Sequence, residues 1–207
     1  MYQLFTIFLF LFFSPLTTTS VSDNHQLVLD IDGKPVQSNT NYYILPVMRG
    51  NGGGLTLDSR NTTQLCPLYV SQQNQEVSNG LPLKFLPVNP KHKTISVSSD
   101  LNMVFDAASI CVQSNVWSLI KDDQGSERRY VGAGGQVGNP GIGTLSNWFR
   151  IDKAGSGEYD YKIVYCPGVC DVCRVACGDI GVFIEKDGRR LLGVNRDKPL
   201  LVMFKKA

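Results

Sequence analysis

The six cysteines are the residues of this chain whose types and spacing most clearly suggest chemistry. They are Cys66, Cys111, Cys166, Cys170, Cys173 and Cys177, and the last four follow the spacing C-x3-C-x2-C-x3-C. Four such thiolates could hold zinc, but no histidine lies near them. An even number of cysteines behind a secretory leader is instead typical of disulfides. We therefore expect three disulfides and no metal, and the residues alone leave open which cysteines pair.

The other reactive side chains do not form a catalytic pattern. The chain has two histidines, His25 and His92, and no G-x-S-x-G nucleophile motif. The glycine-rich stretch 132–138 has the spacing G-x-G-x3-G, and no helical pattern follows it, so it does not predict a nucleotide site. We expect a protein that is not an enzyme and that uses no cofactor.

The first residues resemble a targeting signal. Leu4–Phe13 is apolar except for one threonine, and small residues follow as far as Ser22. A run of this length is too short to cross a bilayer, which takes about 20 residues, but it suits a secretory signal peptide. We predict a signal peptide over residues 1–22 and one domain over residues 23–207. The expected location is extracellular, in the apoplast, with the vacuole as an alternative.

Charge adds little about partners. The net charge is +2 and the basic residues are scattered, which does not favour nucleic acid or a membrane surface as partner. Asn61-Thr62-Thr63 is a sequon for N-glycosylation, and we expect a glycan on Asn61.

Short stretches with period-two alternation predict an all-β domain, and no long helical stripe interrupts them. A chain of many short strands separated by glycine and proline turns is typical of a sandwich or a closed barrel. The predicted strands are 27–29, 42–47, 93–97, 102–105, 148–151, 161–165, 182–184 and 200–204.

Several motifs, spread over the whole domain, are similar to those of the soybean Kunitz inhibitor family. They are VLDIDGKPV at 28–36 followed by YYI at 42–44, GGGL at 52–55, CPL at 66–68, NWFRI at 147–151, YKIVYCP at 161–167 and CGDIG at 177–181. The extra cysteines in CPGVCDVC at 166–173 resemble the miraculin-like branch of that family.

This resemblance implies a fold and a set of pairings. The fold would be a disulfide-stapled β-trefoil of twelve strands in three pseudo-repeats, six strands closing a barrel and six capping it. The pairings would be Cys66–Cys111, Cys166–Cys177 and Cys170–Cys173. The cysteine that joins two chains in a member of this branch corresponds to Ala154, so we expect a monomer.

The resemblance also implies a function: inhibition of a trypsin-like serine endopeptidase in plant defence. An exposed loop, held extended, would enter the protease as a substrate does. The matching residues are Pro87, Asn89, Pro90, Lys91, His92, Lys93 and Thr94. Either Lys91 or Lys93 could enter the acidic pocket of the protease, so the scissile bond is Lys91-His92 or Lys93-Thr94.

One departure from the family pattern concerns the support of this loop. Trypsin-inhibiting members have an asparagine four residues before the Tyr-Tyr pair, and its side chain braces the loop. This chain has Ser38 there, followed by Asn39. Either Asn39 takes over the role through a shifted backbone, or the loop is looser and inhibition is weaker.

The sequence leaves two alternative functions open. The protein could inhibit a cysteine or aspartic protease through another loop, either Arg128-Arg129 or the turn from Arg49 to Gly54. It could also be a non-inhibitory binding or storage protein, since loops on a rigid barrel suit many tasks.

Overall fold

The computed structural model describes residues 26–60, 63–122, 127–195 and 197–207. The predicted signal peptide over residues 1–22 and the glycosylation site Asn61 lie outside the described residues. Within them, no helix is long and apolar enough to cross a membrane.

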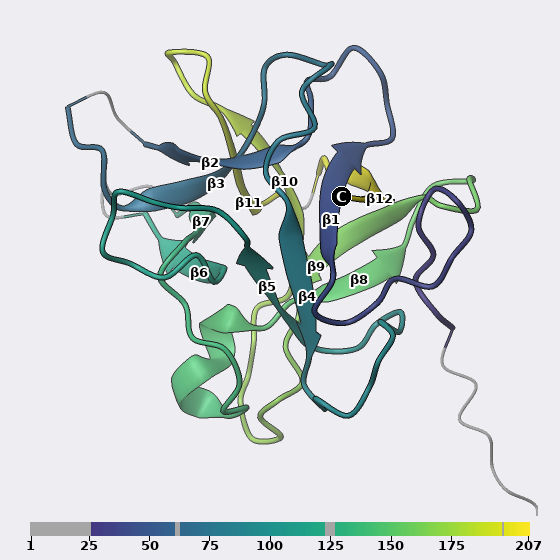
Figure 1. Ribbon diagram of the computed structural model, residues 1–207. Helices are drawn as coiled ribbons and strands as arrows, with labels where there is room; N and C mark the ends of the chain where they lie inside the picture. Colours follow the sequence, from purple (N-terminus) through teal and green to yellow (C-terminus); the bar gives the residue numbers. More distant parts are fainter. Residues whose placement is uncertain (1–25, 61–62, 123–126, 196) are drawn as a thin grey trace, which may run out of the picture.

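The described residues form twelve strands and one short 3-10 helix, η1 (Figure 1). The strands are β1 Asn41–Pro46, β2 Leu55–Ser59, β3 Leu68–Gln72, β4 Leu83–Pro87, β5 Leu101–Phe105, β6 Ser118–Lys121, β7 Arg129–Gly132, β8 Arg150–Lys153, β9 Tyr161–Tyr165, β10 Gly178–Ile184, β11 Arg190–Val194 and β12 Leu201–Lys206; η1 is Ile142–Asn147.

Six strands close a barrel. Antiparallel pairing runs from β5 through β4, β1, β12 and β9 to β8. A bridge between Leu101 at the start of β5 and Phe149 beside β8 completes the ring. Closure satisfies the backbone groups that an open sheet would leave unpaired at its edges.

The other six strands form three hairpins that cap the barrel: β2–β3, β6–β7 and β10–β11. The inner strands β3, β7 and β11 also pair with one another. Each successive group of four strands thus contributes to the barrel and to the cap, which defines the β-trefoil that the resemblance implied.

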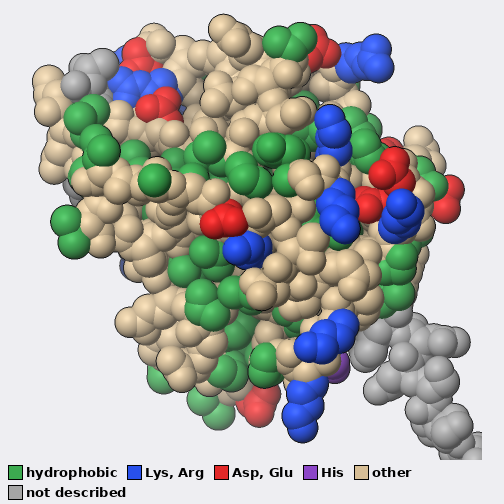
Figure 2. Space-filling model, in the orientation of Figure 1, with side chains coloured by type: hydrophobic (Ala, Val, Ile, Leu, Met, Phe, Trp, Pro, Cys, Tyr) green, Lys and Arg blue, Asp and Glu red, His purple; other side chains and the backbone are tan. Residues whose placement is uncertain are grey.

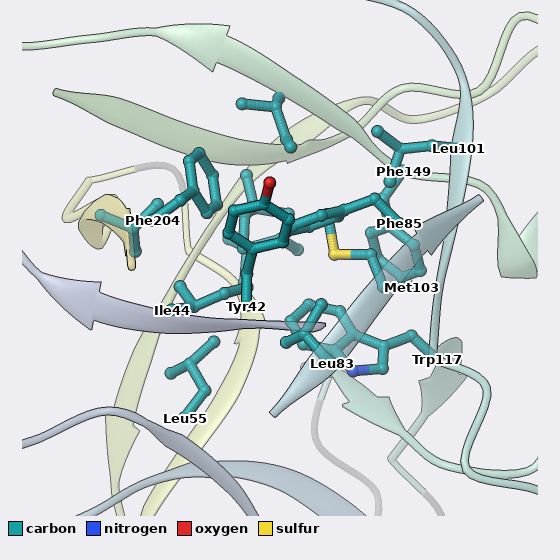
Figure 3. Packing of buried hydrophobic residues seen from close by; sticks show 14 of the residues in the cluster. Tyr42, Ile44, Leu55, Leu83, Phe85, Leu101, Met103, Trp117, Phe149 and Phe204 are labelled. Carbon is teal, nitrogen blue, oxygen red and sulfur yellow. The ribbon is translucent and has the colours of Figure 1, made fainter. Parts of the chain in front are cut away.

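Alternating side chains fill the barrel. In β1, Tyr42 and Ile44 point inward and are buried, because successive side chains of a strand point to opposite faces. The ring of Phe85 packs edge-on against Phe204, with centroids 5.3 Å apart, and lies 6.1 Å from Tyr42 (Figure 3). Trp117 makes a similar contact with Phe149 across the same core. This aromatic core gives the barrel a rigid frame from which the loops project.

The structure corrects two of the predicted strands. Segments 27–29 and 93–97 contain only isolated bridges: Leu27 with Ser96, Leu29 with Pro35 and Thr94 with Gln37. These segments run beside the closed barrel and meet each other without joining its ladders.

Candidate functional site

The segment between β4 and β5 projects into solvent. Residues 88–93 are all exposed, and Figure 2 shows basic side chains and a histidine protruding at the lower end of the molecule, where this loop lies in Figure 1. The structure therefore brings Asn89, Pro90, Lys91, His92 and Lys93 to the surface as one continuous feature, whereas Pro87 is the last residue of β4 and Thr94 is half-buried.

The tip of this loop is a closed turn. The amide of His92 donates to the carbonyl of Asn89 (3.1 Å), and the amide of Lys91 donates to the Asn89 side-chain oxygen (3.1 Å). Pro90 occupies the second position of this four-residue turn, where its fixed φ favours the turn conformation. The backbone at Lys91 is thus turned in the free molecule, and our expectation of an extended segment was wrong at this point.

The base of the loop is held by backbone hydrogen bonds on both sides. The amide of Val88 donates to the carbonyl of Asp100 (2.9 Å), and the amide of Ser38 donates to the carbonyl of Lys93 (2.8 Å). Thr94 is bridged to Gln37. The Lys91-His92 bond therefore lies at the tip, whereas the Lys93-Thr94 bond lies at the paired base.

Ser38 and Asn39 lie beside the loop but do not brace it with their side chains. The backbone of Asn39 has φ 56° and its amide donates to the carbonyl of Phe85 (3.0 Å). In the part of the chain that the structure describes, neither side chain bonds to residues 88–93. A hollow of about 500 Å³ lies between the segment of Ser38 and Asn39 and the loop after β4. Its lining includes Ser38, Asn39, Pro90 and Lys93. The side chain of Asn39 therefore does not take over the bracing role, and the contact that Ser38 makes with the loop is through its backbone amide.

Asp100 connects the base of the loop to a neighbouring segment. Its carboxylate accepts from Arg150 at 2.8 and 3.3 Å and from the amide of Gly168 at 3.0 and 3.2 Å, while its carbonyl accepts from Val88. The hydrogen bond to Asp100 raises the pKa of the Arg150 guanidinium. A Cβ at position 168 would come within 2.3 Å of the end of the Arg150 side chain, so a larger residue there would push the guanidinium out of this arrangement. Sequence reasoning missed Asp100, since its partners are 50 and 68 residues away.

Replacing Asp100 by alanine should lower the free energy of unfolding by about 2 kcal/mol, because Arg150 and the Gly168 amide lose their acceptor in a partly buried site. Urea denaturation measures this change. Asp100→Asn retains one acceptor oxygen and should have a smaller effect. A loss below about 0.5 kcal/mol for Asp100→Ala, as is usual for a surface substitution, would contradict the role of the carboxylate.

The disulfides have the pairing that the resemblance implied. Cys66 is bonded to Cys111, Cys166 to Cys177 and Cys170 to Cys173. No described cysteine is free, and no described cluster of side chains could hold a metal ion. Because all four of the last cysteines are paired in disulfides, the disulfide interpretation of their spacing is confirmed over the zinc one.

The arginines of one alternative loop are engaged with the protein itself. The guanidinium of Arg128 stacks on Phe183 (4.8 Å to the ring centroid) and lies 3.8 Å from a carboxylate oxygen of Glu185. Arg129 donates to the carbonyl of Ala176 (2.9 Å). In contrast, Lys91 makes no ion pair with any described residue, which leaves its ammonium free for a partner.

A closed trefoil with a projecting basic loop defines a class of rigid protein that displays loops for binding. Comparison with known proteins makes this specific: the legume Kunitz family model, described as trypsin and protease inhibitor, matches residues 28–206. This chain therefore belongs to the Kunitz family of trypsin and protease inhibitors.

Individual relatives agree with this assignment. The chain is 47% identical to miraculin of Synsepalum dulcificum over 86% of this chain and 82% of that protein. It is 48% identical to Kunitz trypsin inhibitor 5 of Arabidopsis thaliana over 87% and 85% of the two chains. Among solved structures, it is similar to a Kunitz-type cysteine protease inhibitor from potato (TM-score 0.75, 31% identity, 88% of this chain and 98% of that one). Soybean trypsin inhibitor is also similar (TM-score 0.70, 29% identity, 88% and 100%).

Proposed function

We propose that this protein inhibits a serine endopeptidase of the trypsin type, with Lys91 as the residue that enters the acidic pocket of the protease. One observation carries the proposal: Lys91 is the free, exposed cation at the tip of a loop whose two sides are tied to the domain. A partner with a carboxylate at the bottom of its specificity pocket binds such a side chain. The names of the trypsin-inhibiting relatives support the same partner class.

The anchors of the loop account for inhibition in place of rapid cleavage. Hydrogen bonds from Val88 to Asp100 and from Ser38 to Lys93 hold the segments on either side of the Lys91-His92 bond. A cut at that bond would leave both new ends in place, which favours rejoining. The turn at the tip has to open on docking, and the loss of the Asn89–His92 hydrogen bond costs about 1 kcal/mol.

Titration of trypsin with the purified protein tests this function. We expect trypsin activity to fall in proportion to the added protein, with at least one equivalent of trypsin bound tightly per chain. Chymotrypsin, whose pocket is apolar, is the matched control and should be inhibited less. Full trypsin activity in the presence of micromolar protein would refute the proposal.

We further propose that the protein works in an oxidising compartment outside the cytosol, as a plant defence protein. Its three disulfides are of the kind that persists after secretion, and the apolar leader at Leu4–Phe13 supports the same route. Secretion of a fusion carrying residues 1–22 would test the leader, and retention of the fusion inside the cell would contradict it.

Ser38→Asn should strengthen inhibition about tenfold, because the longer amide reaches into the hollow beside the loop and adds a hydrogen bond or two of about 1 kcal/mol each. The inhibition constant for trypsin is measured for the parent protein and for the Ser38→Asn variant. Both proteins also carry Arg49→Ala, because Arg49 is the basic residue of an alternative loop. Ser38→Ala is the control and should leave the constant unchanged. A weaker Ser38→Asn inhibitor would show that the hollow does not accept the amide.

A further inference from the structure

A second basic loop follows β1. Residues 48–51 are exposed, with Met48 at 59% exposure next to Arg49. Like the Lys91 loop, this segment is a short turn that carries one basic side chain away from the surface.

This loop is also tied down on both sides. Before it, the amide of Val47 donates to the carbonyl of Leu201 (3.0 Å). After it, the guanidinium of Arg190 donates to the carbonyl of Asn51 (2.8 Å) and is itself fixed by two bonds to the side-chain oxygen of Gln72 (3.0 and 2.9 Å). The four exposed residues thus span two fixed points.

Close packing of glycines strengthens the second anchor. The amides of Gly53 and Gly54 donate to the carbonyls of Gln73 and Ser78 (2.7 and 2.8 Å). A Cβ on Gly53 would come within 2.2 Å of a backbone oxygen, and one on Gly54 within 2.0 Å of another. Only glycine allows the chain to pass so close, so the segment behind Arg49 has little freedom to move.

The Arg49 guanidinium is unpaired within the described residues, unlike those of Arg150 and Arg189, which contact Asp100 and Asp187. The next residue, Gly50, has φ 80° and open space where a Cβ would stand. A protein partner can therefore reach both the side chain of Arg49 and the Arg49-Gly50 bond.

The two basic loops lie at opposite ends of the barrel. Strands β1 and β4 are antiparallel neighbours, so the loop after β1 and the loop after β4 leave the barrel in opposite directions. Figure 1 shows them at the upper and lower ends of the molecule. Two bulky partners can approach these ends without collision.

We propose that the loop around Arg49 is a second docking site for a trypsin-type protease, so that one chain holds two protease molecules, one at each end. The inference rests on the proposed function for its partner class, and its own evidence is a free arginine on a loop anchored at Val47 and Asn51. Arginine and lysine both suit an acidic pocket, because each places a cation at the end of a long, thin stem.

The stoichiometry of the trypsin complex tests this inference. Active-site titration should give two equivalents of trypsin per chain, and light scattering after gel filtration should give the mass of one chain with two proteases. Lys91→Ala and Arg49→Ala should each retain one equivalent, and the double variant none. Arg49→Lys, the matched control, should retain both.

Other outcomes separate the two proposals. One equivalent that Lys91→Ala abolishes and Arg49→Ala leaves intact would overturn the second site and support the first. One equivalent lost only in Arg49→Ala would overturn the Lys91 assignment and support the Arg49 loop. Cleavage at Arg49-Gly50 with full recovery of activity would overturn the second site, since the loop would be a substrate. No binding by the parent protein would overturn both.

Discussion

Replacing Lys91 by alanine, in a chain where Arg49 is also alanine, is expected to raise the inhibition constant for trypsin by about 10³-fold or more. The variant leaves the acidic pocket of the protease without its cation, and such central contacts contribute about 4 kcal/mol or more, which corresponds to this ratio. The Arg49→Ala background confines the measurement to the loop after β4. Steady-state inhibition of trypsin, read with a chromogenic substrate, gives the constant.

Lys93→Ala in the same background is the matched control. Lys93 is equally basic and exposed, but its carbonyl is bonded to Ser38 and the next residue, Thr94, is bridged to Gln37. Its loss should change the constant less than about threefold, as expected for a contact outside the centre of an interface. A large effect of Lys93→Ala with none for Lys91→Ala would place the scissile bond at Lys93-Thr94 instead.

Removal of the Cys66–Cys111 disulfide is expected to have the largest effect on stability. The bond closes a loop with a sequence separation of 45, and in the chain-entropy model such a crosslink contributes about 4 kcal/mol by restricting the unfolded state. The Cys66→Ala/Cys111→Ala double variant should lose about that much free energy of unfolding, as measured by urea denaturation under non-reducing conditions.

The Cys170–Cys173 disulfide provides the comparison, because its sequence separation is only 3. The same model gives it about 1.5 kcal/mol, so Cys170→Ala/Cys173→Ala should be much the milder double variant. If the two variants lost equal stability, contacts made by the sulfurs, and not loop length, would control the effect.

The all-β class and several strands could be predicted because their signal is local. In β1, β9 and β12, inward and outward side chains alternate, and the residues that face the barrel are the apolar ones. Strands β3 and β11 escaped prediction for a physical reason. They pair with each other at the centre of the cap and bury several consecutive residues, so their period-two signal is lost.

For the candidate site, too, some features could be predicted from the sequence and others could not. The motif resemblance located the basic loop and named the cysteine pairs, and both predictions concern residue types that can be read along the chain. The sequence did not show which lysine lies at the tip of the loop. The hydrogen bond from the amide of Ser38 to the carbonyl of Lys93, 55 positions later in the chain, places Lys93 at the base and leaves Lys91 at the tip. The support from Asp100 likewise depends on Arg150 and Gly168, which only the closed barrel brings together.

By itself, then, the sequence determined the strand-rich class, the family and the segments that could bind a protease. The tertiary structure decided which of those segments are free and which are engaged: Lys91 and Arg49 extend into solvent, whereas Arg128 and Arg129 contact their own domain. The physical reason is that side-chain periodicity follows from neighbouring residues, whereas exposure and anchoring depend on hydrogen bonds and packing between residues far apart in the chain.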